Sequence, residues 1–141
     1  MLIDFRCSNK FPNSKLSSTI STATKFSFRN SSKINLQGTI STSSQNIHLK
    51  DPVTLSGVTG VSTGTGVGNI TFDSTVDGTH NLTLNAGTGD VIFSQAVGGS
   101  QKLGVLDVTG ANIKLGANLS TADSNIDFRG DVREPLPRSF K

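Results

Sequence analysis

Residues 68–99 read GNITFDSTVDGTHNLTLNAGTGDVIFSQAVGG, and one short sequence motif, which we call the phrase, occurs twice in this stretch. NITF (69–72) returns 21 residues later as DVIF (90–93), and VDG (76–78) returns as VGG (97–99). Self-similarity at a fixed period of about 20 to 50 residues is typical of stacked repeat architectures. The echo therefore raises the question of what one copy of the phrase supplies to the next.

The echo belongs to a longer series with the pattern Φ-x-Φ-x-x-x-Φ, in which Φ is an aliphatic residue or Phe. Two Φ residues separated by one residue point to the same side of a strand, and the three-residue gap that follows breaks this alternation. The gap carries residues that turn a chain, such as Gly38 and the pair Asp51-Pro52. Six copies fit the pattern: Ile34/Leu36/Ile40, Ile47/Leu49/Val53, Ile70/Phe72/Val76, Val91/Phe93/Val97, Ile113/Leu115/Leu119 and Ile126/Phe128/Val132.

Two further repeats strengthen this pattern. A second phrase lies between the copies, as VTLSG (53–57), LTLNA (82–86) and LDVTG (106–110). The window 34–53 also aligns without gaps to the window 113–132. Each copy thus reads as a short strand, a corner and the start of the next strand.

These repeats predict a β-solenoid over residues 34–132, with about four to five coils stacked about 4.8 Å apart and paired through their backbones. One coil alone cannot bury its apolar side, so each copy supplies a neighbour for the last. The positions between the two Φ residues should face solvent, and Lys50 and Asp73 should lie on adjacent coils, where an exposed ion pair contributes about 0–1 kcal/mol. The solvent-facing positions are Asn35, His48, Thr71, Ile92, Lys114 and Asp127.

The composition favours β-strands and argues against a nucleic-acid-binding face, a disulfide framework and a membrane span. The chain of 141 residues has 33% hydrophobic residues, 15 Gly and no Trp or Tyr. The net charge of +3 comes from the two ends, because the middle of the chain is acidic, so no basic face for nucleic acid is expected. Cys7 is the single cysteine, which excludes a disulfide framework within the chain. No apolar run approaches the roughly 18 residues of a membrane span.

The two ends do not follow the phrase. Residues 1–33 are basic and rich in Ser and Thr, and we expect them to be disordered or weakly attached; we expect the same of 133–141. A basic, Ser-rich, acid-poor start is also how an organelle transit peptide looks. The first residues, MLIDFRCSNKFP, lack the apolar core of a secretory signal peptide.

The paired phrases NITF (69–72) and LTLNAGTGD (82–90), with LDVTGANIKLGANLSTADSNIDF (106–128), resemble the repeats of large bacterial surface adhesins of the filamentous-haemagglutinin-like and autotransporter type. The resemblance covers about residues 34–132. It implies a right-handed parallel β-helix that is secreted or held at the outer cell surface, as a stalk for attachment. Such proteins are usually far longer, so the chain looks like a fragment of a longer parent.

Arg129-Gly130-Asp131 is the RGD tripeptide that integrins read in host adhesion. In the predicted register it occupies the corner after Phe128, where it would be exposed. The alternative is structural, because Arg129 occupies the place of Lys50 in the earlier window and Gly130 is a turn glycine. Short motifs also occur by chance.

An enzyme is the main competing class, because β-helix enzymes use clustered carboxylates. Such chemistry needs two carboxyl groups about 5–9.5 Å apart, or several oxygen ligands around a metal. Asp73, Asp77 and Asp90 are predicted near turns, where Asp is favoured for conformational reasons. His48 and His80 have no partner at metal-ligand spacing, and a solvated position is expected for both. We therefore expect no catalysis, no metal and no cofactor.

Two other short patterns have structural explanations. The glycine-rich runs at 64–68 and 87–89 lack the Lys-Ser/Thr and the helix of a phosphate-binding loop, and they read as turns. Asn30, Asn69, Asn81 and Asn118 head N-x-Ser/Thr sequons, three of which the strand phrase itself generates.

The sequence thus leaves two hypotheses. The first is a structural stalk segment of an adhesin, whose partners are a host or neighbouring-cell surface, protein or glycan, and copies joined through the open solenoid ends. The second is a β-helix that binds or cleaves carbohydrate, which would need aromatic platforms or clustered carboxylates. The aromatic residues of the middle, Phe72, Phe93 and Phe128, are all predicted to point inward.

Overall fold

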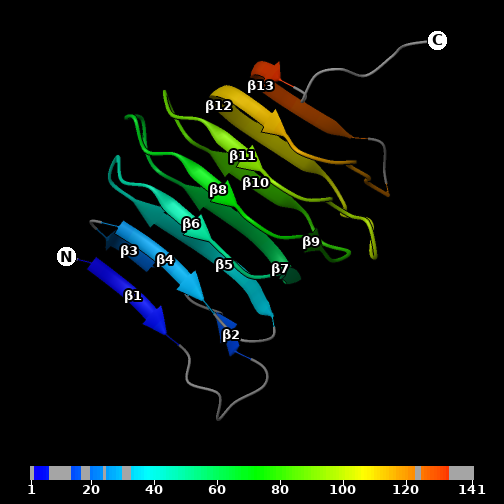
Figure 1. Cartoon of the computed structure of the whole chain (residues 1–141), viewed down its shortest axis with the longest axis horizontal. Helices are drawn as coiled ribbons and strands as arrows, with labels where there is room; N and C mark the ends of the chain where they lie inside the picture. Colours follow the sequence, from blue (N-terminus) through cyan, green and yellow to red (C-terminus); the bar gives the residue numbers. More distant parts are fainter. Residues whose placement is uncertain are drawn as a thin grey trace.

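The chain forms an all-β solenoid of about five turns with parallel strands and no helix among its described residues, as predicted (Figure 1). This computed structural model describes residues 33–122 and 125–133 with their side chains, and the backbone of earlier strands at 2–6, 14–16, 20–23 and 25–29. Successive coils stack from the N-terminal strands toward the C-terminal strands (Figure 1). Each coil contributes to three parallel strand ladders, which we call the first, second and third ladders in the order in which a coil visits them.

The first ladder carries the phrase that the sequence repeats most clearly. Ile47, Ile70, Val91 and Ile113 are register partners on successive coils, and Val132 follows Ile113. The ladder contains β1 (Leu2–Arg6), β4 (Lys25–Arg29), β6 (Ile47–Leu49), β8 (Ile70–Phe72), β11 (Val91–Phe93), the end of β12 (Leu106–Leu115) and the end of β13 (Ile126–Arg133).

The second ladder follows one corner later in each coil. It contains β2 (Ser14–Leu16), the start of β5 (Ile34–Thr42), the start of β7 (Val53–Ser62) and β9 (Val76–Asp77). Isolated bridges from Val76 to Val97 and from Val97 to Leu119 continue it.

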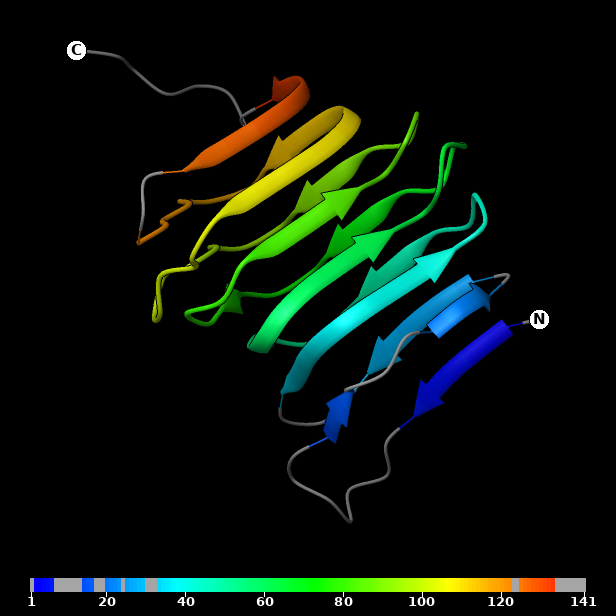
Figure 2. The ribbon, with the colours of Figure 1, turned by 180° about the vertical axis from the view of Figure 1, so that it is seen from behind.

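The third ladder completes the coil. It contains β3 (Ile20–Ala23), the ends of β5 and β7, β10 (Leu82–Asn85), and the starts of β12 and β13. The long strands β12 and β13 bend between the third ladder and the first (Figure 2), at a register shift between Thr109 and Asn112. The bend lets one continuous strand serve two ladders.

The core is the set of apolar columns enclosed by the three ladders. Ile70, Phe72, Val91 and Phe93 are at most 1% exposed, which confirms the predicted inward positions. The rings of Phe72 and Phe93 stack with centroids 5.2 Å apart and an interplanar angle of 11°. Removing such columns from water is the main stabilising term that a repeat without disulfides can use.

Two of the six predicted copies lie on other ladders than the remaining four. Ile34 is the register partner of Val53 on the second ladder, and Ile126 is the partner of Leu106 on the third. The alignment of 34–53 with 113–132 therefore relates segments displaced by one ladder. The same phrase serves all three ladders because each needs two inward residues and a corner.

Strand segments also precede the predicted start of the solenoid at Ile34. β1, β2, β3 and β4 pair within the same sheet. Apart from Lys33, the rest of the predicted basic segment 1–33 lies outside the described residues, as does all of the predicted tail 133–141 except Arg133. The same holds for Cys7 and Asn30.

Candidate functional site

The RGD tripeptide lies in β13, on the last described coil. Arg129, Gly130 and Asp131 are all exposed, and they occupy the bend between the third and first ladders, as the sequence predicted. Gly130 has a φ of 156°, and a Cβ there would collide with the carbonyl oxygen of Gly110 on the coil below. The glycine is therefore required by the close approach of two coils.

The Arg129 side chain is held by carboxylates on one side of the bend. Its Nη2 donates to Asp127 Oδ2 at 2.7 Å, and its Nη1 lies 3.8 Å from Asp107 Oδ2. Asp107 and Asp127 are register partners on adjacent coils, so two like charges stack directly. Arg129 offsets their repulsion, a role that sequence reasoning missed because it placed Asp107 in a different phrase from Asp127.

A chain of polar side chains runs along the start of the first ladder. Asn46 Oδ1 accepts from the Asn69 backbone N–H, and Asn69 Oδ1 accepts from the Asp90 backbone N–H, both at 2.8 Å. Asp90 Oδ1 accepts from Asn112 Nδ2, and Asn112 Oδ1 accepts from Arg133 Nε. In the sequence an Asn or Asp stands immediately before each of these strand segments, and the bonds that these residues form fix the register of one coil on the next.

Polar side chains of neighbouring coils also pair on the outer side of the first ladder. Lys114 Nζ lies 2.7 Å from Asp90 Oδ2, and His48 Nε2 lies 2.7 Å from Asp73 Oδ2. The hydrogen bonds from Lys114 and then Asn112 hold the pKa of Asp90 below its ordinary value. Lys50 and Asp73 do occupy adjacent coils, but the described partner of Asp73 is His48.

The acidic residues that the competing enzyme hypothesis would use lie at different points along the coils. Asp73 follows β8, Asp77 lies in β9, and Asp90 precedes β11. Asp77 Oδ1 accepts from the backbone N–H groups of Ser100 and Gln101, so each of the three carboxylates already has partners on the neighbouring coil. Asp thus serves here to join coils as well as to form turns.

Polar residues at two sequons and in one glycine-rich run also have structural partners. Asn69 and Asn81 accept from backbone N–H groups of the next coil through Oδ1. Thr63 is buried, and its hydroxyl donates to the Gly68 carbonyl at 2.8 Å, closing the 64–68 run as a turn before β8. Asn118 and His80 lie in segments between strands.

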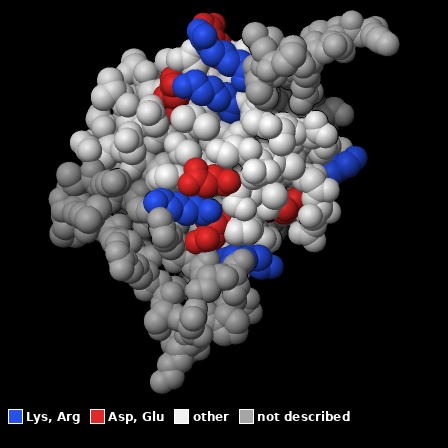
Figure 3. Space-filling model, viewed as in Figure 1, with Lys and Arg blue, Asp and Glu red and all other residues white. Residues whose placement is uncertain are grey.

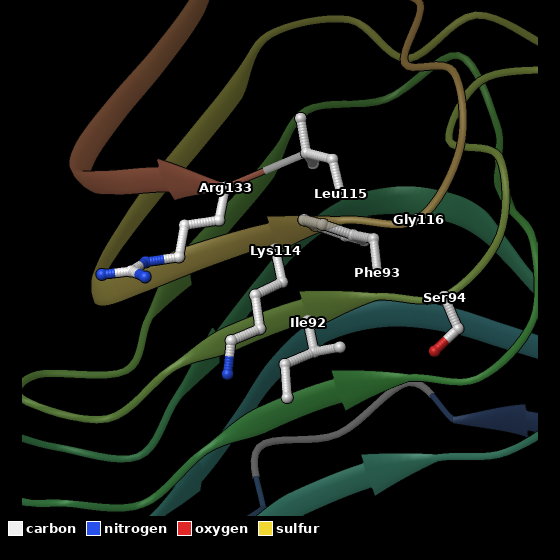
Figure 4. A pocket seen from close by; sticks show the side chains of 7 residues that line it. All are labelled: Ile92, Phe93, Ser94, Lys114, Leu115, Gly116 and Arg133. Atoms are coloured by element: carbon white, nitrogen blue, oxygen red, sulfur yellow. The ribbon is translucent and has the colours of Figure 1, made fainter. Parts of the chain in front are cut away.

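Three hollows border described residues near the C-terminal coil. One, of about 370 Å³, opens beside the first ladder, and Lys114 and Arg133 extend to the same side of it from neighbouring strands (Figure 4). A second, of about 380 Å³, lies beside Asp107 and Asp127, where Asp107 Oδ1 is buried without a hydrogen-bond partner. A third, of about 410 Å³, is bordered by Leu119, Ile126 and Phe128 at the end of the apolar columns.

On the face in Figure 3, positive and negative side chains lie next to one another in small groups, and uncharged areas lie between the groups. Within the part of the chain that the structure describes, no cluster of three or more His, Cys, Asp or Glu side chains could hold a metal ion. The same residues include no helix long and apolar enough to cross a membrane.

No family model, curated protein or solved structure matches this chain.

Proposed function

We propose that residues 34–132 are a structural stalk segment of a secreted or surface-exposed adhesin, with no catalytic role. The observation that supports this most is the use of polar residues: Asp77, Asp90 and Asn69 bind the neighbouring coil. Side chains that an enzyme would aim at a substrate are used here to hold the repeat together.

We also propose where the segment works and what it contacts. The segment would work outside the cell or on its outer surface, within a longer parent that contacts a host or neighbouring cell. Self-association would occur through the open solenoid ends, because a strand edge left unpaired invites another chain. The adhesin assignment rests on the resemblance of the strand phrases over 34–132.

The test is a screen of the purified chain against acidic polysaccharides, with and without calcium. We expect no product and no binding that depends on the Asp residues. Turnover that is lost in Asp107→Asn would reject the stalk and favour a polysaccharide-cleaving β-helix. That second function has less support, because Phe72 and Phe93 are buried and offer no platform for a sugar ring.

The RGD tripeptide is tested separately, by adhesion of integrin-bearing cells to the immobilised chain. Recognition would be abolished by Asp131→Glu, since that change lengthens the exposed acidic side chain and leaves the Arg129 contacts in place. Equal adhesion to the unsubstituted chain and to the Asp131→Glu variant would show that the tripeptide is not recognised, and Arg129 would then have a structural role alone.

A further inference from the structure

The N-x-Ser/Thr sequons at Asn69, Asn81 and Asn118 have different surroundings. Asn69 Oδ1 accepts from the Asp90 backbone N–H at 2.8 Å, and Asn81 Oδ1 accepts from the Val105 backbone N–H at 2.9 Å. The backbone of the next coil therefore fixes both amides. Within the part of the chain that the structure describes, no hydrogen bond holds the Asn118 amide, and this residue is exposed.

The place of Asn118 in its coil explains this difference. Pro52, Thr75, Ala96 and Asn118 each precede an inward residue of the second ladder, and the carbonyl oxygen of each accepts a backbone hydrogen bond from the preceding coil. Pro and Ala side chains carry no hydrogen-bonding group, so the stack holds this position through its backbone. A group attached to the Asn118 side chain would therefore leave the contact between coils intact.

The backbone around Asn118 also differs from that of the other two sequons. Thr71 and Thr83, their hydroxyl residues, lie in β8 and β10, and each of these strands pairs with a neighbour on both sides. Leu119, the middle residue of the third sequon, takes part in an isolated bridge outside the named strands. A segment with fewer backbone bonds opens locally at lower cost, so a modifying enzyme can bind it more readily.

We propose that Asn118 is a site of N-linked glycosylation, with a sugar joined through a diphosphate to a nucleotide or a lipid as the donor. Asn118 Nδ2 attacks the anomeric carbon of the sugar, and the bond from that carbon to the diphosphate breaks. The diphosphate leaves with the electron pair, and a proton passes from Nδ2 to a base of the transferase. This inference rests on the proposed function, because a transferase of the export route would act on a secreted or surface-exposed segment.

The experiment offers the folded chain and, separately, its tryptic digest to two transferases, one with a nucleotide-linked donor and one with a lipid-linked donor. Peptide mass spectrometry locates the sugar, and the arm that gives product identifies the donor. The digest frees all three sequons from the solenoid, so Asn69, Asn81 and Asn118 should all be modified in it. In the folded chain, occupancy at Asn118 should exceed that at Asn69 or Asn81 by about tenfold or more.

Two matched variants test the role of the sequon. Ser120→Ala should remove the sugar from Asn118, whereas Ser120→Thr should keep it, because the hydroxyl is retained. Asn118→Gln should remove the acceptor and leave the urea unfolding curve of the unmodified chain unchanged, since the Asn118 side chain bonds no other coil.

Three outcomes would overturn the assignment. They are equal occupancy at the three sites of the folded chain, an unmodified Asn118 in a folded chain whose digest is modified, and a digest in which neither transferase modifies Asn118. Each would leave the stalk proposal standing, whereas polysaccharide turnover would reject the stalk whatever the state of Asn118.

Discussion

Single residues in this protein act mainly across the gap between coils. Asp90 accepts from Asn112 and pairs with Lys114, both on the next coil. Arg129 lies between Asp107 and Asp127 of adjacent coils. The stability of the solenoid at the residue scale should therefore depend on pairs about 20 residues apart in sequence.

Asp90 should make stability depend on pH in the acid range. Its folded pKa is lowered, so its contribution is present above the unfolded value of about 3.9 and is lost as pH falls through the folded pKa. In urea unfolding at pH 7 and at successively lower pH values, Asp90→Asn should be less stable than the parent at pH 7 and should lose less stability below pH of about 4. Lys114→Met should also make the free energy of unfolding fall less as the pH is lowered, because Asp90 then lacks its charged partner. An unchanged pH profile in both variants would contradict this role.

Phe93→Asp should abolish the fold, because Phe93 is 1% exposed and stacks on Phe72. A carboxylate placed there has no partner, and burying an unpaired charge costs several kcal/mol. The far-ultraviolet circular dichroism spectrum of the Phe93→Asp variant should lack the β-type signal that the unsubstituted chain shows. Gln95→Asp is the matched control, since this nearby residue is exposed and should tolerate the charge.

At the scale of elements, the turns between the third and first ladders stack as closely as the strands. A Cβ at Gly89 would collide with the carbonyl oxygen of Gly68 on the preceding coil. A Cβ at Gly60, within β7, would meet only the Thr39 side chain at 3.6 Å or more. The two positions therefore differ in the space that the neighbouring coil leaves: backbone lies directly against Gly89, whereas only a side chain at ordinary contact distance lies beside Gly60.

Gly89→Ala should destabilise the protein by about 1–3 kcal/mol in urea unfolding, because the backbone of the neighbouring turn must shift to make room. Gly60→Ala should leave the free energy of unfolding within about 1 kcal/mol of the parent, since the space is open and alanine lowers the entropy of the unfolded chain. Equal losses in the two variants would show that the turn is not the tighter contact.

The whole molecule behaves as a one-dimensional stack, in which each coil contacts its two neighbours. Ile70 and Val91 are register partners 21 residues apart, so residues 70–90 make up one complete coil. In such arrays stability is approximately a sum of terms for repeats and for their interfaces. Removing one coil should then shorten the solenoid without changing its path.

Deletion of residues 70–90 should keep the β-type circular dichroism spectrum and lower the melting temperature, because β11 can stack on β6 in the register that β8 used. Deletion of residues 70–80 removes about half a coil and should abolish folding, because β7 and β10 both end on the third ladder and would lose the first- and second-ladder strands, β8 and β9, that lie between them. Similar melting curves for the two deletions would contradict a stack of complete coils.

Much of this architecture follows from the sequence because the signal is local. The alternation at Ile70 and Phe72, and its return at Val91 and Phe93, depend only on residues one or two apart and on the length of one coil. A strand with one apolar side must bury it, and a repeat of about 21 residues places the next copy above the last. The buried columns through Ile70 and Phe72 and the exposed corner at Gly130 required nothing further.

Only the tertiary structure decided which ladder each phrase joins. The phrase at Ile34 and the phrase at Ile126 read like the one at Ile70, yet they lie on the second and third ladders. The three ladders make the same demand on a strand, and the lengths of the intervening turns decide the assignment. For the same reason the contact of Arg129 with Asp107 and Asp127 was hidden: a pairing between coils depends on where each coil closes, and no single phrase carries that information.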